Sequence, residues 1–446
     1  MSITRISRRK AVKLGVAATA LPLVHIRGAG AAGKLSVFFW DHWVPAGNEV
    51  IKKQVAAWSD KNKVDVSVDF ITSNGFKTLL TINAEAQAKT GHDVITIPNW
   101  EVHNQSANME PMDDVVGRLV AKYGKTNRVS EYLGQSKNSW LAVPSSWGTQ
   151  NKGPCGRISI LRDVAGIDVT KMWPASATET PEAKAWTYDA MLKAAEACHK
   201  VGKTFGIGVG VTADSVDTAG AIFAAFGAEL ITGEGEIAVK SDAVRQVLEY
   251  GQQLVKFLPA DAVSYDDASN NRALISGQSA LIWNPPSAWA TAVRDAPKVA
   301  EDCWTFPAPS GPKGRFMPHS MNFWGVWKFS PNKTAAKELI EHLMQRENVM
   351  ARSDVTLGYD LPPFISMTDF NIWNESGPPK GTVYNYPVRP HHHTESTLSM
   401  MPAPPEIAVQ AYNRGTVSTM FAKLQSGQTI PQVVAWAQEE LEGFKR

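Results

Sequence analysis

The hydrophobic pattern near the start of the chain predicts a strand, a helix and a second strand. Residues 35–39 form a short, mostly apolar run, which is typical of a strand covered on both faces. Apolar residues then recur on one face of a helix over residues 51–58, which Asn48 can cap. Residues 64–70 alternate between apolar and polar, so the second strand is expected at a sheet edge. This order is that of a βαβ unit.

The alternation of helices and strands continues along the chain and predicts an α/β fold. Helical periodicity recurs at residues 76–89, 186–200, 242–258, 334–350, 406–425 and 431–444, and strand-like runs lie at 94–97, 140–144 and 323–329. Ser241 is expected to cap the third of these helices. Residues 205–211 carry three alternating glycines without the spacing of a nucleotide-binding loop, so we interpret them as a glycine-containing strand.

Composition and charge are those of an ordinary globular protein. The chain has 446 residues, 43% of them hydrophobic and 20% charged, and a length that suggests two or three domain-sized units. The formal net charge of +2 comes without a basic block, which argues against a nucleic-acid partner. Beyond the N-terminus, no run is long and apolar enough to span a membrane. No motif indicates a cofactor.

The N-terminal residues have the pattern of an export signal. Arg8 and Arg9 precede a modest apolar run at residues 14–24, and residues 29–31 supply small side chains for cleavage. The pattern resembles the twin-arginine export signal, with an ordinary secretory signal as the alternative. We therefore expect residues 1–31 to be removed and the mature protein to be periplasmic.

The three cysteines, Cys155, Cys198 and Cys303, are far apart and form no CxxC pair. In the periplasm two of them could form one disulfide, and the sequence does not choose the pair. Three buried free thiols are the expected arrangement.

Tryptophans follow several predicted strands, at the edge where α/β proteins bind ligands. The chain has 15 Trp against 9 Tyr. A tryptophan ring packs on the C–H face of a sugar, and neighbouring polar side chains can bond its hydroxyls. For any single tryptophan, packing within the fold is the alternative, and Trp327 is expected in the core. The candidate ligand-binding residues are Trp40, Asp41, His42, Trp43, Asn99, Trp100, Trp147, Gln150, Asn284, Trp289, Asn322 and Trp324.

Five short motifs occur in the order seen in a known family. They are Gly-His-Asp-Val-Ile at 91–95, Glu-Pro-Met-Asp-Asp at 110–114, Leu-Ala-Val-Pro at 141–144, Gly-Gln-Ser-Ala-Leu-Ile-Trp-Asn at 277–284 and Ser-Pro-Asn-Lys-Thr-Ala-Ala at 330–336. In these motifs the chain resembles the extracellular solute-binding proteins of ABC importers, of the carbohydrate type that includes maltose-binding protein. Residues 159–163 depart from the strand that the family usually shows there.

The resemblance implies two α/β lobes with a ligand cleft between them, a monomer without a cofactor, and a membrane permease as partner. Its pattern implies one lobe of residues 34–145 plus 306–350 and another of 146–305 plus 351–446. Trp40, Trp43 and Trp100 are then expected on one cleft wall, with Trp147 and Asn284 on the opposing lobe.

The same residues are compatible with two other functions. Asp41 between Trp40 and Trp43 could hold an amine, so a polyamine-binding protein is an alternative. An exported glycoside hydrolase would need two facing carboxylates, for which Asp41 and Glu101 are candidates that nothing in the sequence pairs. Residues 391–393 are three adjacent histidines, which lack metal-ligand spacing and are interpreted as an exposed loop.

Overall fold

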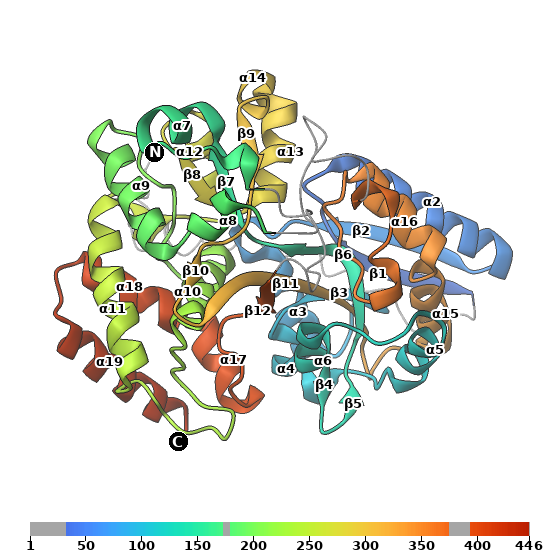
Figure 1. The fold of residues 1–446 in the computed structure, drawn as a ribbon. Coiled ribbons are helices and arrows are strands. Elements are labelled where there is room, and N and C mark those ends of the chain that lie inside the picture. Colours follow the sequence, from blue (N-terminus) through green and yellow to red (C-terminus); the bar gives the residue numbers. More distant parts are fainter. Residues whose placement is uncertain (1–32, 173–178, 374–392, 446) are drawn as a thin grey trace, which may run out of the picture.

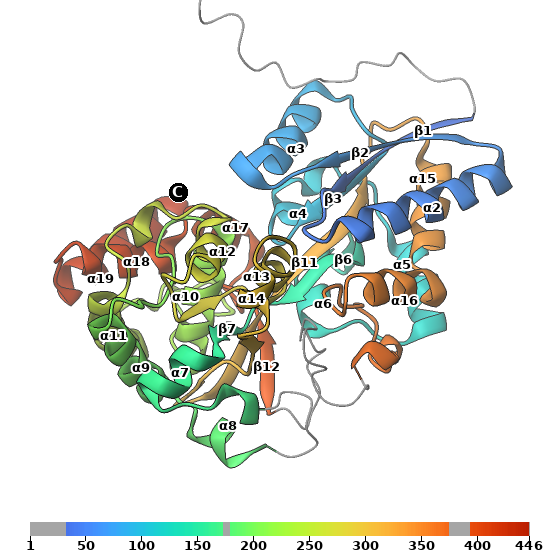
Figure 2. The same cartoon turned by 90° about the horizontal axis from the view of Figure 1, so that it is seen from above.

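Two α/β lobes lie side by side in the protein, as Figures 1 and 2 show. The computed structural model describes residues 33–172, 179–373 and 393–445. Arg8, Arg9, His391 and His392 lie outside these ranges. The predicted two-lobed α/β fold is confirmed.

A seven-stranded mixed sheet runs through the first lobe and into the second. Its order is β10-β11-β3-β1-β2, with β6 and β12 also paired to β11. The strands are β1 (Lys34–Trp40), β2 (Asp65–Ile71), β3 (Val94–Pro98), β6 (Val143–Asn151), β10 (Ser310–Gly311), β11 (Gly314–Val326) and β12 (Thr394–Thr397). A smaller sheet in the second lobe has the order β8 (Leu281–Trp283), β7 (Pro154–Arg157), β9 (Cys303–Thr305), and β4 (Gln135–Ser136) pairs with β5 (Ser139–Trp140).

Helices cover both lobes. Those of the first lobe are α2 (Pro45–Asn62), α3 (Lys77–Ala88), α4 (Glu101–Asn104), α5 (Asp113–Tyr123), α6 (Arg128–Gly134), α15 (Lys333–Leu343) and α16 (Arg346–Val355). Those of the second are α7 (Ile158–Ala165), α8 (Pro181–Ala185), α9 (Tyr188–Lys200), α10 (Ala213–Phe226), α11 (Asp242–Leu254), α12 (Ser269–Ile275), α13 (Pro285–Asp295), α14 (Pro297–Ala300), α17 (Pro405–Asn413), α18 (Thr416–Gln425) and α19 (Ile430–Phe444). Short 3-10 turns are Asn74–Phe76, Ser106–Asn108, Val169–Lys171, Val255–Phe257, Ala262–Ser264, Ile365–Met367 and Asn371–Trp373.

The predicted opening unit is present as β1, α2 and β2. β2 is an edge strand, as its alternation predicts, and it pairs in parallel with β1. Along β1, Val37 and Phe39 pack in the core under α2, while Phe38 packs with Ile82 of α3 on the other face. Burial on both faces explains the continuous apolar run.

The predicted cap of α2 is wrong. The helix begins at Pro45, whose fixed φ suits a first helical position. Asn48 lies one turn inside the helix, where its side chain donates to Asp41 Oδ1 at 2.8 Å and accepts from the His42 backbone N–H. Ser241, by contrast, caps α11 as expected, since its hydroxyl accepts from the Val244 backbone N–H.

Residues 205–211 are extended but form no strand ladder, so that prediction is wrong. Gly206 donates to the Leu281 carbonyl and Val209 to that of Ala262, in two different neighbouring segments. A Cβ on Gly206 would lie 2.6 Å from Ser279 Oγ, and one on Gly210 would lie 2.6 Å from the Val263 carbonyl oxygen. The glycines therefore allow close packing of backbone against its neighbours.

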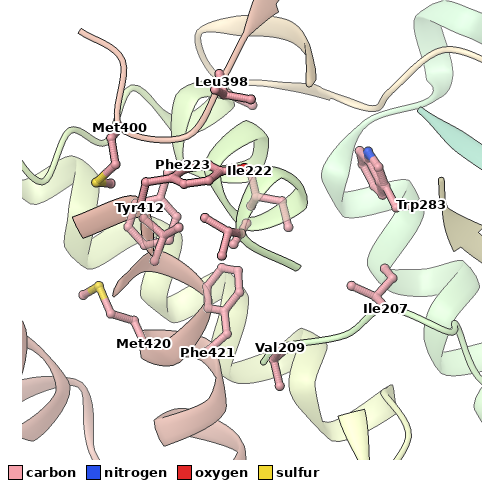
Figure 3. Packing of buried hydrophobic residues seen from close by; sticks show 14 of the residues in the cluster. Ile207, Val209, Ile222, Phe223, Trp283, Leu398, Met400, Tyr412, Met420 and Phe421 are labelled. Carbon is pink, nitrogen blue, oxygen red and sulfur yellow. The ribbon is translucent and has the colours of Figure 1, made fainter. Parts of the chain in front are cut away.

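The core of the second lobe lies around α10. Figure 3 shows Ile222 and Phe223 of α10 gathered with Tyr412 of α17 and with Met420 and Phe421 of α18. Cys155, Cys198 and Cys303 are all buried free thiols, as expected. Within the described residues, no helix has both the length and the apolar character that a membrane span needs.

Two segments pack on the lobe opposite to the one expected from the family's pattern. Phe306 packs on Trp186 of the second lobe, with ring centroids 5.6 Å apart, and β11 crosses between the lobes only beyond this point. Residues 351–373 supply Tyr359, Phe364 and others to the core of the first lobe. The motif order gives the lobe boundaries only as positions along the chain. In the structure, β11 crosses from one lobe to the other, and α16 extends past the expected boundary. We propose that residues 351–373 belong to the first lobe.

His319 lies on β11 beside the crossing strand β6, is buried, and has no charged partner among the described residues. Its Nδ1 lies 2.7 Å from Asn151 Oδ1, and burial lowers its pKa to about 4 from the usual 6.5. This imidazole stays neutral in the folded protein but becomes protonated in the unfolded protein. The free energy of unfolding therefore falls as the pH drops below 6.5.

We therefore expect this histidine to cost about 2 kcal/mol of unfolding free energy between pH 7 and pH 5, at about 1.4 kcal/mol per pH unit below 6.5. Denaturant unfolding of the wild type and of His319→Gln at both pH values measures it, because only the wild type carries this titration. Parallel pH dependences in the two proteins would contradict the prediction.

Candidate functional site

A cavity of about 480 Å³ lies between the two lobes. The first lobe supplies the carboxyl ends of β1 and β3 with the first turns that follow, and the second lobe supplies the start of α10 and parts of the chain before α12 and α13. The lining residues are Trp40, Trp43, Ser73, Phe76, Thr78, Leu79, Asn83, Thr96, Pro98, Asn99, Trp100, Glu101, Asn104, Gly148, Gln150, Lys152, Val211, Ala213, Asp214, Asp267, Asn284, Ser320, Asn322, Tyr412 and Asn413. Both aromatic faces and polar groups are therefore present, as a hydroxylated ligand requires.

Seven of the twelve candidate residues predicted from the sequence line this cavity. They are Trp40, Trp43, Asn99, Trp100, Gln150, Asn284 and Asn322. Trp40, Trp43 and Trp100 come from the first lobe and Asn284 from the second. Whether any of them binds a ligand stays a prediction.

The other five candidates lie away from the cavity lining. Trp147 lies on the first lobe and not on the opposing one, because its indole donates to the Trp40 carbonyl at 2.9 Å and packs on Phe39. Trp324 is fully buried in the same core, beneath the Arg352 guanidinium. Trp289 belongs to a small core cluster around α13.

Asp41 and His42, the remaining two, are held by groups of the protein. His42 Nε2 lies 3.0 Å from the buried carboxylate of Asp360, which also accepts from the Gly148 backbone N–H. Asp41 is exposed and accepts from Asn48. An amine-binding or glycosidase role for Asp41 thus finds no support in the cavity geometry.

Gly148 brings β6 against the floor of the cavity. It has φ +72°, and a Cβ there would lie 2.6 Å from Asn322 Nδ2 and 2.7 Å from the Trp40 ring. Only glycine fits this conformation and this approach. Asn322 in turn donates to the Trp147 carbonyl at 2.9 Å, which fixes its amide.

A chain of polar contacts joins the two lobes at the cavity. Lys152 Nζ lies 2.8 Å from Asp214 Oδ1 and 3.0 Å from Asp217 Oδ2. The Tyr412 hydroxyl donates to Asp217 Oδ1 at 2.9 Å and accepts from Asn99 of the first lobe at 3.1 Å. Asn99 has φ +41°, a conformation that asparagine tolerates better than most residues. The contact between the lobes therefore consists of polar side chains that bond to one another.

Burial and ion pairing shift the pKa values of the charged groups among these side chains. Burial by itself would lower the pKa of Lys152, but the carboxylates of Asp214 and Asp217 outweigh it and hold that pKa above its ordinary value. Burial raises the pKa of Asp217, opposed by Lys152. The lysine thus stays charged, and its charge is already matched within the protein.

Sequence reasoning missed Lys152, Asp214, Asp267 and Tyr412. Lys152 comes directly after β6. The other three follow no tryptophan-ended strand, since Asp214 is in the first turn of α10, Tyr412 is near the end of α17, and Asp267 lies in a loop. The acidic first turn of α10 was a visible signal, but an acid at a helix start more often serves the helix itself.

Metal chemistry finds no support in the described part of the chain. Among residues 33–172, 179–373 and 393–445 there is no group of three His, Cys, Asp or Glu side chains placed to hold a metal ion.

A family model described as bacterial extracellular solute-binding protein matches residues 44–350. Comparison with curated proteins finds no match. Among solved structures, maltose-bound MalE3 of T. maritima is 18% identical, with a TM-score of 0.69 over 92% of this chain and 99% of its own. A sugar transporter from Arthrobacter chlorophenolicus A6 with bound laminaribiose is 18% identical, with a TM-score of 0.70 over 92% and 99%.

A solute-binding protein from Thermotoga lettingae TMO, bound to α-D-tagatose, is 16% identical, with a TM-score of 0.70 over 93% of this chain and 100% of its own. At these identities the likeness shows a shared fold.

Proposed function

The chain belongs to the bacterial extracellular solute-binding proteins, and on that premise we propose that it captures a sugar or related polyol in the cavity between its lobes. A membrane permease of an ABC importer is then its partner. The observation that carries the proposal is the cavity itself, whose lining combines the partly exposed ring of Trp43 with the buried amide groups of Gln150 and Asn284. Tryptophan faces pack on pyranose rings, and amides bond to hydroxyls.

Two hydrogen-bond acceptor atoms in this cavity are available to donor groups of a ligand. Asn284 Oδ1 and Gln150 Oε1 are buried and accept no hydrogen bond from any residue that the structure describes. An unpaired buried acceptor costs about 1–3 kcal/mol, which a ligand hydroxyl would recover. The matched family and the similar structures are binding proteins, so we propose capture without turnover.

A thermal-shift screen over sugars, polyols and amines tests this function, followed by calorimetry on each hit. We expect at least one sugar to raise the melting temperature while no product forms. Solution scattering should also give a smaller radius of gyration at saturation, because a ligand held by both lobes favours the closed state. Release of product from a chromogenic glycoside would instead support a hydrolase, and the absence of any sugar hit would contradict the proposal.

We also propose that the protein is exported to the periplasm by the twin-arginine route and acts there as a monomer. Arg8 and Arg9, with the apolar run that follows them, support the route. Fractionation of cells that lack the twin-arginine translocase tests it, since a mature protein that still reaches the periplasm would contradict this route.

A further inference from the structure

One carboxylate in the cavity accepts no hydrogen bond from the residues that the structure describes. Of the acids in the lining, Glu101 accepts from Asn104 and Gln105 of its own turn. Asp214 accepts from Lys152, as described above, and from two amides, those of Asn270 and Asn284 at 3.0 Å each. These two acids are thus satisfied by the protein.

Asp267 is the exception. It lines the cavity and is partly buried, and none of the residues that the structure describes gives its side chain a hydrogen bond. Burial, together with the nearby negative charge of Asp214, raises the pKa of Asp267 to about 7, although the charge of Lys152 opposes the shift. A carboxylate in this position gains from a charged donor more than from a neutral one.

The surrounding groups are acceptors too. Asn284 is 4% exposed, and with its amide nitrogen committed to Asp214 and to the Ser287 hydroxyl, its free oxygen remains as an acceptor in the same cavity. Gln150, 8% exposed, offers a second such oxygen. The Asn284 amide bonds to Asp214, the charge of Asp214 acts on Asp267, and all three residues line the same cavity.

Among the described lining residues, no unpaired cationic side chain bonds to these acceptors. Lys152 is the one lysine there, against three carboxylates, and it is held between Asp214 and Asp217. A neutral hydroxyl group can donate to Asp267, but it brings no positive charge to balance the carboxylate when the ligand removes it from water.

Resting on the proposed function, we infer that the preferred ligand is a cationic sugar, an aminated saccharide or amino polyol whose ammonium group donates to Asp267 and Asn284. An ammonium group carries three donors and one positive charge, which match the carboxylate and the free amide oxygen together. Trp43 on the first lobe, whose ring is only partly buried, remains available for the sugar ring.

Calorimetry on matched pairs tests the inference: glucosamine against glucose, galactosamine against galactose, and the chitosan disaccharide against cellobiose, with N-acetylglucosamine as an uncharged analogue. We expect the aminated member of at least one pair to bind about ten- to hundredfold more tightly at pH 7.5 than its neutral parent. Asp267→Asn should remove this preference, and Asp267→Glu, which keeps the charge, should retain most of it.

The matched control is Asp261→Asn, which removes one negative charge from an exposed position in the same region. It should leave the preference unchanged, and melting temperatures show whether each variant is folded. If the neutral member binds equally well or better in every pair that binds, the inference is overturned while the proposed function stands. If no member of any pair binds, the inference is also overturned, while the proposed function is decided separately by the thermal-shift screen over sugars and polyols.

Discussion

Replacing Lys152 with methionine is expected to lower the free energy of unfolding by about 3–5 kcal/mol. Methionine keeps the length of the side chain but leaves the carboxylates of Asp214 and Asp217 without their cation. Asp217 is 0% exposed, so water cannot replace the lost partner. Breaking a buried ion pair from one side is costly because the other charge stays buried. Urea unfolding at pH 7.5 followed by circular dichroism measures the loss.

Lys200→Met is the matched control. Its ammonium group lies 2.7 Å from Glu196, but its side chain is 68% exposed, so the same substitution should cost no more than about 0.5 kcal/mol. Adding Asp217→Asn to Lys152→Met should recover part of the stability, because the amide carries no charge to leave unpaired. A loss below about 1 kcal/mol in Lys152→Met would show that Asp217 does not depend on the lysine.

The local sequence pattern predicted helices and strands well where burial alone determines the pattern. β1, α2 and β2 follow from periodicity alone, because burial on one or both faces imposes period 2 or 3.6 on the sequence. The helix predicted over 406–425 is two helices, since Gly415 adopts φ +62° against Val211 of another segment. That contact is tertiary, so no window along the chain contains it.

The sequence predicted part of the cavity lining but not the charged residues in it. Strand ends placed Trp40, Asn99 and Trp100 at one edge of a sheet, because parallel strands end on the same side. Trp147 and Trp324 also follow or lie in strands, yet the side on which they pack is set by helices that arrive from elsewhere in the chain. Asp267 lies in a loop whose position depends on the whole second lobe, which no local pattern reports.

Trp43→Ala is expected to lower the affinity for the sugar found in the screen about ten- to hundredfold, with a loss of less than about 1 kcal/mol in stability. Trp43 lines the cavity and is only partly buried, so its exposed face is free to pack on a ring. Apolar area covered by a ligand contributes about 25 cal/mol per Å², which for one stacked ring gives about 1–3 kcal/mol of binding. Calorimetry and thermal unfolding on the same preparations separate the two quantities.

Trp324→Ala provides the opposite case with the same change of side chain. This tryptophan is 0% exposed, packs beside Phe39 and lies outside the cavity lining, so its loss should leave a void costing about 3–5 kcal/mol. The folded fraction should keep its affinity within about threefold, because the stacking surface is untouched. If Trp43→Ala instead loses stability and keeps its affinity, the ring at position 43 serves the core, and the sugar must lie on other parts of the cavity wall.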